Sequence, residues 1–76
     1  MTLYLERYKM APVEKIAMRI KVLRKRKGWT QEMLAEKAGI GRSHLARLET
    51  AQQDPTLSTL EKIAKAFRVK LSALVD

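Results

Sequence analysis

The sequence predicts an all-α fold, a compact bundle of about five helices. Apolar residues recur at helical spacing along most of the chain, strand-like runs are nearly absent after Ala11, and there are only 3 Gly and 2 Pro. With 76 residues, 46% of them hydrophobic, the chain has the size and composition of one folded domain. We assign residues 12–76 to that domain and residues 1–11 to an N-terminal arm.

The first predicted helix runs from Pro12 to about Lys27. Proline suits the first turn of a helix, where its missing N–H removes no hydrogen bond, and Gly28 marks the end. One side of the segment is an apolar stripe at helical spacing, made of Val13, Ile16, Ala17, Ile20 and Leu23. The segment is also the most basic part of the chain. We therefore expect one side to pack on a core while the cations stay at the surface.

Two shorter helices are predicted at 31–38 and at about 42–49. Thr30 stands where its hydroxyl can accept from the first free N–H groups of the former helix, and Gly39 suits the left-handed residue that ends it. Ala35 is small enough to let two helices cross closely. Such a pair, spanning about residues 31–50, is typical of a helix-turn-helix, whose second helix enters the major groove of DNA.

The chain after Thr50 predicts a fourth helix and a short last one. Asp54-Pro55 breaks any helix, and Thr56 can cap the helix that follows. The expected buried face of that helix consists of Leu57, Leu60, Ile63, Ala64 and Phe67. The last short turn or helix carries the apolar residues Val69, Leu71, Leu74 and Val75.

Charge and composition narrow the function. The net charge of +8 favours a polyanion, either nucleic acid or an anionic membrane surface. No apolar run approaches the length of a membrane span, and the N-terminus lacks the order of a signal peptide, so we expect a cytoplasmic, nucleoid-associated protein without membrane contact. With no Cys, one His and no clustered carboxylates, nothing indicates a metal site, a cofactor or an enzyme.

An ordered set of residues resembles the phage-repressor helix-turn-helix family, the lambda repressor/Cro or XRE-like type. The set comprises Arg24, Gly28, Thr30-Gln31, Leu34-Ala35, Ala38-Gly39-Ile40, Leu45, Leu48-Glu49, Pro55-Thr56-Leu57 and the run from Ile63 to Phe67. The resemblance covers about residues 16–75. Four positions depart from the family pattern in loops and caps, namely Gly41, Ala51, Arg68 and Lys70. Each departure is expected to cost about 0.5–1 kcal/mol and to alter loop geometry more than the fold.

The predicted DNA-contacting residues centre on the second helix of the motif. Ser43 and Arg47 lie one turn apart on one face, where an Arg can give two donors to guanine. Arg42 and His44 flank them. The expected phosphate contacts are Gln31, Arg26, Lys27, Thr50 and Gln52. The resemblance also implies a structural ion pair between Arg24 and Glu49.

A symmetric homodimer is expected, because a domain this small touches few base pairs. Two copies would bind half-sites about 34–36 Å apart in a palindromic operator of double-stranded DNA. The candidate interface is the C-terminal apolar set of Phe67, Val69, Leu71, Leu74 and Val75. Part of that set must instead close the monomer core, and the division stays open.

The predicted function is that of a sequence-specific DNA-binding transcriptional regulator, a dimeric repressor or autoregulator. The resemblance leaves room for a restriction–modification controller protein or the antitoxin of a toxin–antitoxin pair. A protein-interaction module that has lost DNA binding is the alternative of another class; Gln31, Arg42 and Arg47 argue against it. The arm at 1–11 is either an unstructured extension or a segment that packs across a dimer or lies along DNA with Arg7 and Lys9.

Overall fold

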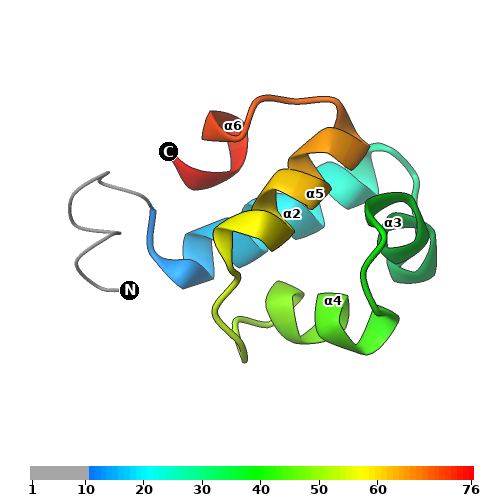
Figure 1. Cartoon of the computed structure of the whole chain (residues 1–76), viewed down its shortest axis with the longest axis horizontal. Coiled ribbons are helices and arrows are strands. Elements are labelled where there is room, and N and C mark those ends of the chain that lie inside the picture. The colour runs from blue at the N-terminus through cyan, green and yellow to red at the C-terminus, as the bar shows by residue number, and fades with distance from the viewer. Residues whose placement is uncertain (1–10) are drawn as a thin grey trace.

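The computed structural model describes residues 11–76, and these residues form five helices (Figure 1). In chain order the helices are α2 (Val13–Arg26), α3 (Gln31–Ala38), α4 (Arg42–Glu49), α5 (Leu57–Phe67) and α6 (Ser72–Val75). The all-α prediction is confirmed. The arm predicted at residues 1–11 lies outside the described residues except for Ala11.

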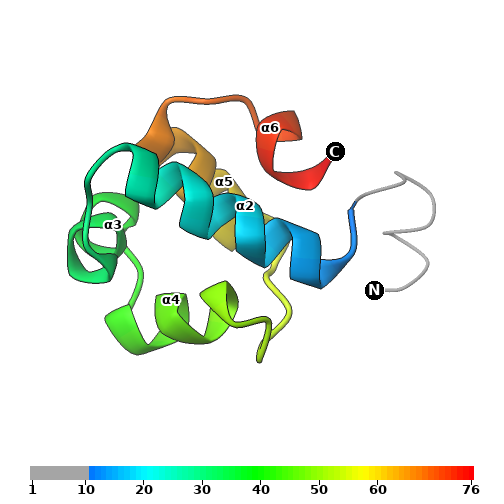
Figure 2. The same cartoon turned by 180° about the vertical axis from the view of Figure 1, so that it is seen from behind.

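The helices α2 and α5 pack against each other through the middle of the domain. In Figures 1 and 2, α4 lies on one side of this pair and α6 on the other, while α3 sits near the end where α2 finishes. The N–H of Ala11 donates to the carbonyl oxygen of Val75 at 2.6 Å, which ties the entry to α2 to the end of α6. The domain therefore has two different faces, one formed by α4 and the other by α6.

All five helices contribute to one core. Ile20, Leu34, Leu45, Ile63 and Leu74, one from each helix in turn, have no exposed surface. Burying such a side chain is worth about 1.5–3 kcal/mol. No helix keeps a core of its own, so the domain is expected to unfold as a unit.

Local hydrogen bonds set the start of α3 and α5. The Thr30 hydroxyl accepts from the Met33 N–H at 3.1 Å, and the Thr56 hydroxyl accepts from the Thr59 N–H at the same distance. Both predicted caps are confirmed. The expected burial of Leu57 is wrong: as the first residue of α5 it is 39% exposed, and Thr59 is buried instead.

Two residues other than glycine adopt the left-handed backbone conformation. Ala51, after α4, and Arg68, after α5, each have a φ of 59°. Both are among the four departures noted in the sequence, at positions where the resemblance implies Gly. Each turn thus has the left-handed residue that a Gly would provide. For a residue with a Cβ this conformation costs about 1–2 kcal/mol.

Substitution of Arg68 by Gly is expected to stabilise the domain. Arg68→Gly relieves the left-handed strain but makes the unfolded chain more flexible, so the free energy of unfolding should rise by about 0.5–1 kcal/mol. Urea denaturation measures the change. Lys65→Gly removes the same charge inside α5, where it should instead lower stability by about 1 kcal/mol. Equal losses in the two variants would show that Arg68 is not strained.

Candidate nucleic-acid interface

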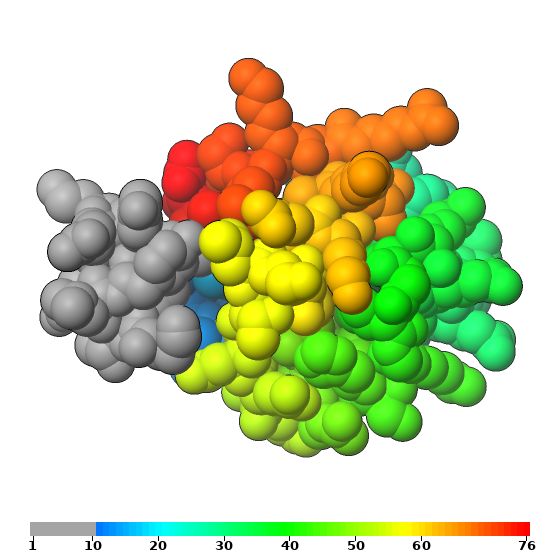
Figure 3. Space-filling model, in the orientation of Figure 1, coloured from blue at the N-terminus to red at the C-terminus, as the bar shows by residue number. Residues whose placement is uncertain are grey.

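The helix α4 turns an apolar side inward and a polar side outward. Leu45 and Leu48 are buried, whereas Arg42, Ser43 and Arg47 are exposed. At 100° per residue the two arginines border one exposed face, with Ser43 between them. Figure 3 shows this helix, in green and yellow-green, along the lower edge of the molecule. Both guanidinium groups are therefore available to one ligand.

A hydrogen bond holds the Arg47 side chain. Its Nε donates to Oε1 of Gln53 at 3.1 Å, while the two Nη groups have no partner among residues 11–76. A guanidinium offers two parallel donors of the kind that match guanine O6 and N7. This role of Gln53 was not predicted from the sequence, because the residue lies in the irregular loop after α4, where no helical periodicity relates it to Arg47.

A buried polar cluster fixes the orientation of α4. The guanidinium of Arg24, on α2, donates to Glu49 through Nε at 2.7 Å and Nη2 at 3.0 Å. Its Nη1 donates to the carbonyl oxygen of Trp29 at 2.8 Å. Nε2 of Gln31 donates to the same Glu49 carboxylate at 3.1 Å. The ion pair that the resemblance implies is thus present, and it joins α2, α3 and α4. We call these four residues the Glu49 cluster.

Four other residues that were predicted to contact DNA lie on or near α4. Gln31 is half-buried at the start of α3, where free backbone N–H groups suit a phosphate. Thr50 is exposed, and its hydroxyl donates back to the carbonyl oxygen of Ala46 at 3.2 Å. Gln52 has an exposed side chain just after the helix, while His44 is half-buried. These positions surround the exposed face of α4.

Arg26 and Lys27, also predicted to contact phosphate, lie away from α4, and their contact with DNA stays a prediction. Arg26 borders a groove with Met18 and with Ala73 of the α6 segment, on the side of α2 opposite α4. The ammonium group of Lys27 lies 5.8 Å from the centre of the Trp29 ring. Helical periodicity distributes these cations around α2 but does not say which neighbouring helix each one meets.

The structure divides the candidate dimer set, a division that the sequence left open. Phe67 and Leu74 are 1% and 0% exposed and Val75 is buried, so these three side chains belong to the monomer core. Val69 and Leu71 pack against that core and keep part of their surface. Of the five apolar residues, only these two remain available to a second copy.

Two structural features are absent within residues 11–76. No helix there is long and apolar enough to cross a bilayer. No group of three His, Cys, Asp or Glu side chains gathers there as a metal site would require.

Comparison with known proteins supports this geometry. The family model HTH_3, described as helix-turn-helix, matches residues 20–74. The chain belongs to the HTH_3 helix-turn-helix family. Among curated HTH_3-type relatives, the chain is 47% identical over 60 residues to the immunity repressor protein of Bacillus phage phi105, covering 79% of this chain and 42% of that protein. It is 40% identical over 62 residues to the transcriptional regulator SinR of Bacillus subtilis, covering 80% and 56%. The chain thus spans about half the length of these relatives.

Solved structures share the HTH_3 fold. The restriction–modification controller protein C.AhdI from Aeromonas hydrophila aligns with a TM-score of 0.79 and 32% identity, over 82% of this chain and 94% of that one. SinR in complex with DNA aligns with a TM-score of 0.74 and 40% identity, over 78% and 95%. The predicted family is confirmed by both kinds of comparison.

Neutralising Glu49 should destabilise the domain. Glu49→Gln leaves the Arg24 charge poorly compensated beside a core, which should lower the free energy of unfolding by about 2–3 kcal/mol in urea denaturation. Glu61→Gln, an exposed site on α5, should change it by less than about 0.5 kcal/mol. The double variant Arg24→Met/Glu49→Leu should lose less than Glu49→Gln, since no charge is left unpaired. A single variant no worse than Glu61→Gln would contradict this account.

Proposed function

We propose that this chain is a sequence-specific, double-stranded-DNA-binding transcriptional regulator that places α4 in the major groove. The observation that carries the proposal is the exposed face of α4, with Arg42 and Arg47 at its borders and a buried cluster behind it. Family membership supports it, as does the existence of a DNA complex of the relative SinR. The phage phi105 relative is named an immunity repressor, which favours repression or autoregulation.

Specific recognition is assigned to the outer face of α4. The two Nη groups of Arg47, held by Gln53, suit bidentate binding to guanine. Arg42 is the second candidate for base contact, whereas the hydroxyl of Ser43 discriminates weakly because it can donate or accept. His44 is assigned to the rim of the contact, as its side chain is half-buried.

Affinity is assigned to contacts with the phosphate backbone. The net charge of +8 supplies a general attraction to DNA. The N-terminus of α3 at Gln31 and the side chains of Thr50 and Gln52 flank α4 and can bind phosphates on either side of the groove. The place of action is then the cytoplasm, in association with the nucleoid.

We further propose that two copies act together on a palindromic operator. A single α4 reads only a few base pairs, and dimers of this motif bind half-sites one helical turn apart. Val69 and Leu71, the partly exposed residues between α5 and α6, are the candidates for the contact.

A second candidate is a restriction–modification controller protein. The alignment with C.AhdI includes 94% of that small protein, whereas the alignment with the phi105 repressor includes 42% of it. The controller role is also DNA-binding regulation, so it differs in the genes controlled and not in the mechanism.

Selection of bound fragments from a random DNA pool tests the function. We expect enrichment of one motif, with two symmetric halves separated by about 10 base pairs. Recovery of a single asymmetric half would contradict the dimer while keeping DNA recognition. The absence of enrichment at low salt would favour the protein-interaction module.

The roles of the arginines can be separated on the selected site. Arg47→Ala should cost about 1–3 kcal/mol of binding free energy and relax selection at one base position. Arg26→Ala is the matched control, because Arg26 borders the groove on the α6 side. It should leave the sequence preference unchanged and weaken binding by less than Arg47→Ala. Equal effects of the two variants, with no change in preference, would contradict base contact by Arg47.

A further inference from the structure

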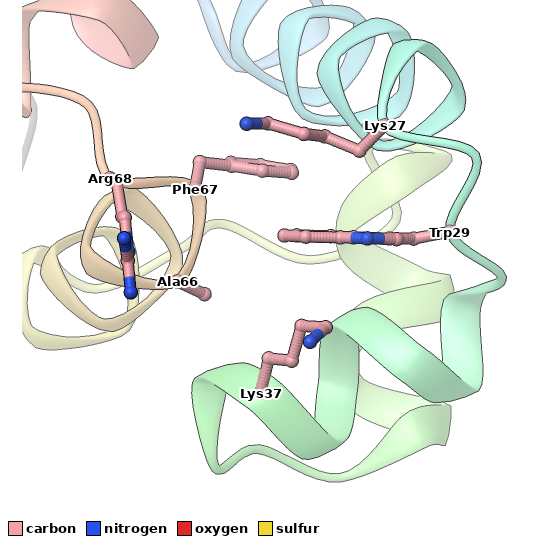
Figure 4. A pocket seen from close by; sticks show the side chains of 6 residues that line it. All are labelled: Lys27, Trp29, Lys37, Ala66, Phe67 and Arg68. Atoms are coloured by element: carbon pink, nitrogen blue, oxygen red, sulfur yellow. The ribbon is translucent and has the colours of Figure 1, made fainter.

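A second concave site lies away from α4. It is a cavity of about 450 Å³ at the end where α2 and α5 finish, and none of its lining residues belongs to α4 (Figure 4). Its lining consists of Lys27, Trp29, Lys37, Ala66, Phe67 and Arg68. The volume falls within the range typical of small-molecule sites, about 300–1,000 Å³.

Two aromatic rings form the wall of this cavity. Trp29 and Phe67 are stacked, with ring centres 5.6 Å apart and planes inclined by 6°. Phe67 is buried, whereas Trp29 is half-buried and lies edge-on to the open space in Figure 4. The side chain of Lys37 lies over the other face of Trp29, with its ammonium group 4.9 Å from the ring centre (Figure 4). A planar ligand can therefore replace the Lys37 side chain on that face.

Three cations converge on this wall, and no carboxylate lines it. Lys27, Lys37 and Arg68 all border the cavity. Within residues 11–76 the one ion pair joins Arg24 to Glu49, so none of the three has a carboxylate partner there. Their mutual repulsion is relieved when an anion enters, because opposite charges attract and a hydrogen bond between ionised partners is stronger than one between neutral groups.

We propose that this cavity binds a small aromatic anion, a planar ring that carries a carboxylate or phosphate group. The ring stacks on the face of Trp29 from which it displaces the Lys37 side chain, and the anionic group lies between the displaced Lys37 ammonium and Arg68. Aromatic stacking supplies shape selectivity, while the charge-assisted hydrogen bonds supply orientation. The volume favours a small molecule over a segment of an acidic protein.

Titration of the intact chain by NMR tests the proposal. Trp29 is the only tryptophan, so its indole N–H gives a single resonance. Benzoate and adenosine 5′-monophosphate should shift this resonance in a saturable way at millimolar concentrations. Inorganic phosphate and benzyl alcohol, which carry only the charge or only the ring, should bind about tenfold more weakly. A response to either aromatic anion supports the site, and the stronger one identifies the preferred anionic group.

Charge variants distinguish the cavity from general attraction to a basic protein. Lys37→Gln and Arg68→Gln should each weaken binding about tenfold, the loss expected for one charge-assisted hydrogen bond. Lys15→Gln, an exposed residue at the far end of α2, should leave affinity unchanged and serves as the matched control.

Three outcomes would overturn the proposal. They are no saturable shift with either aromatic anion, an equal loss of affinity in Lys15→Gln, and inorganic phosphate binding as tightly as the aromatic anions. An acidic peptide that shifts the indole resonance while benzoate and adenosine 5′-monophosphate do not would replace the small molecule with a protein partner.

Discussion

One carboxylate, that of Glu49, determines how the helices of this domain meet. It accepts three hydrogen bonds, two from Arg24 and one from Gln31, at 2.7–3.1 Å. A buried charge is tolerated only when its partners are complete, so α2, α3 and α4 are held in the one arrangement that satisfies it. The net gain in stability from such a pair is small. Its value lies in the uniqueness of the arrangement.

That arrangement determines what the surface offers. Glu49 is the last residue of α4, and holding it against α2 and α3 leaves exposed the face of the helix that Arg42 and Arg47 border. Trp29 belongs both to the cluster, through its carbonyl oxygen, and to the cavity, through its ring. Trp29 therefore links the Glu49 cluster behind α4 to the cavity. No residue of α4 itself lines the cavity.

The sequence predicted whatever depends on near neighbours along the chain. The bounds of α3 and the cap at Thr30 follow from local hydrogen bonds. The ion pair between Arg24 and Glu49 joins distant positions and was predicted only from the family resemblance. What the sequence left open depends on distant packing. Spacing along the first helix did not assign Arg26 to the groove beside α6 or Lys27 to the neighbourhood of Trp29, and it could not divide Phe67 between monomer core and dimer interface. The contact of Gln53 with Arg47 and the cavity could not be predicted either. Both depend on how loop residues pack against helices, which the spacing of residues along the sequence does not give.

The hydrogen bond between Ala11 and Val75 makes the described chain almost a ring. A linker of a few residues could therefore join position 76 to position 11 in a permuted chain from which residues 1–10 are removed. New ends opened at Gln52 to Asp54 would cut no helix and would leave α4 as the last element of the polypeptide. The order of the helices along the backbone is thus separable from the way they pack.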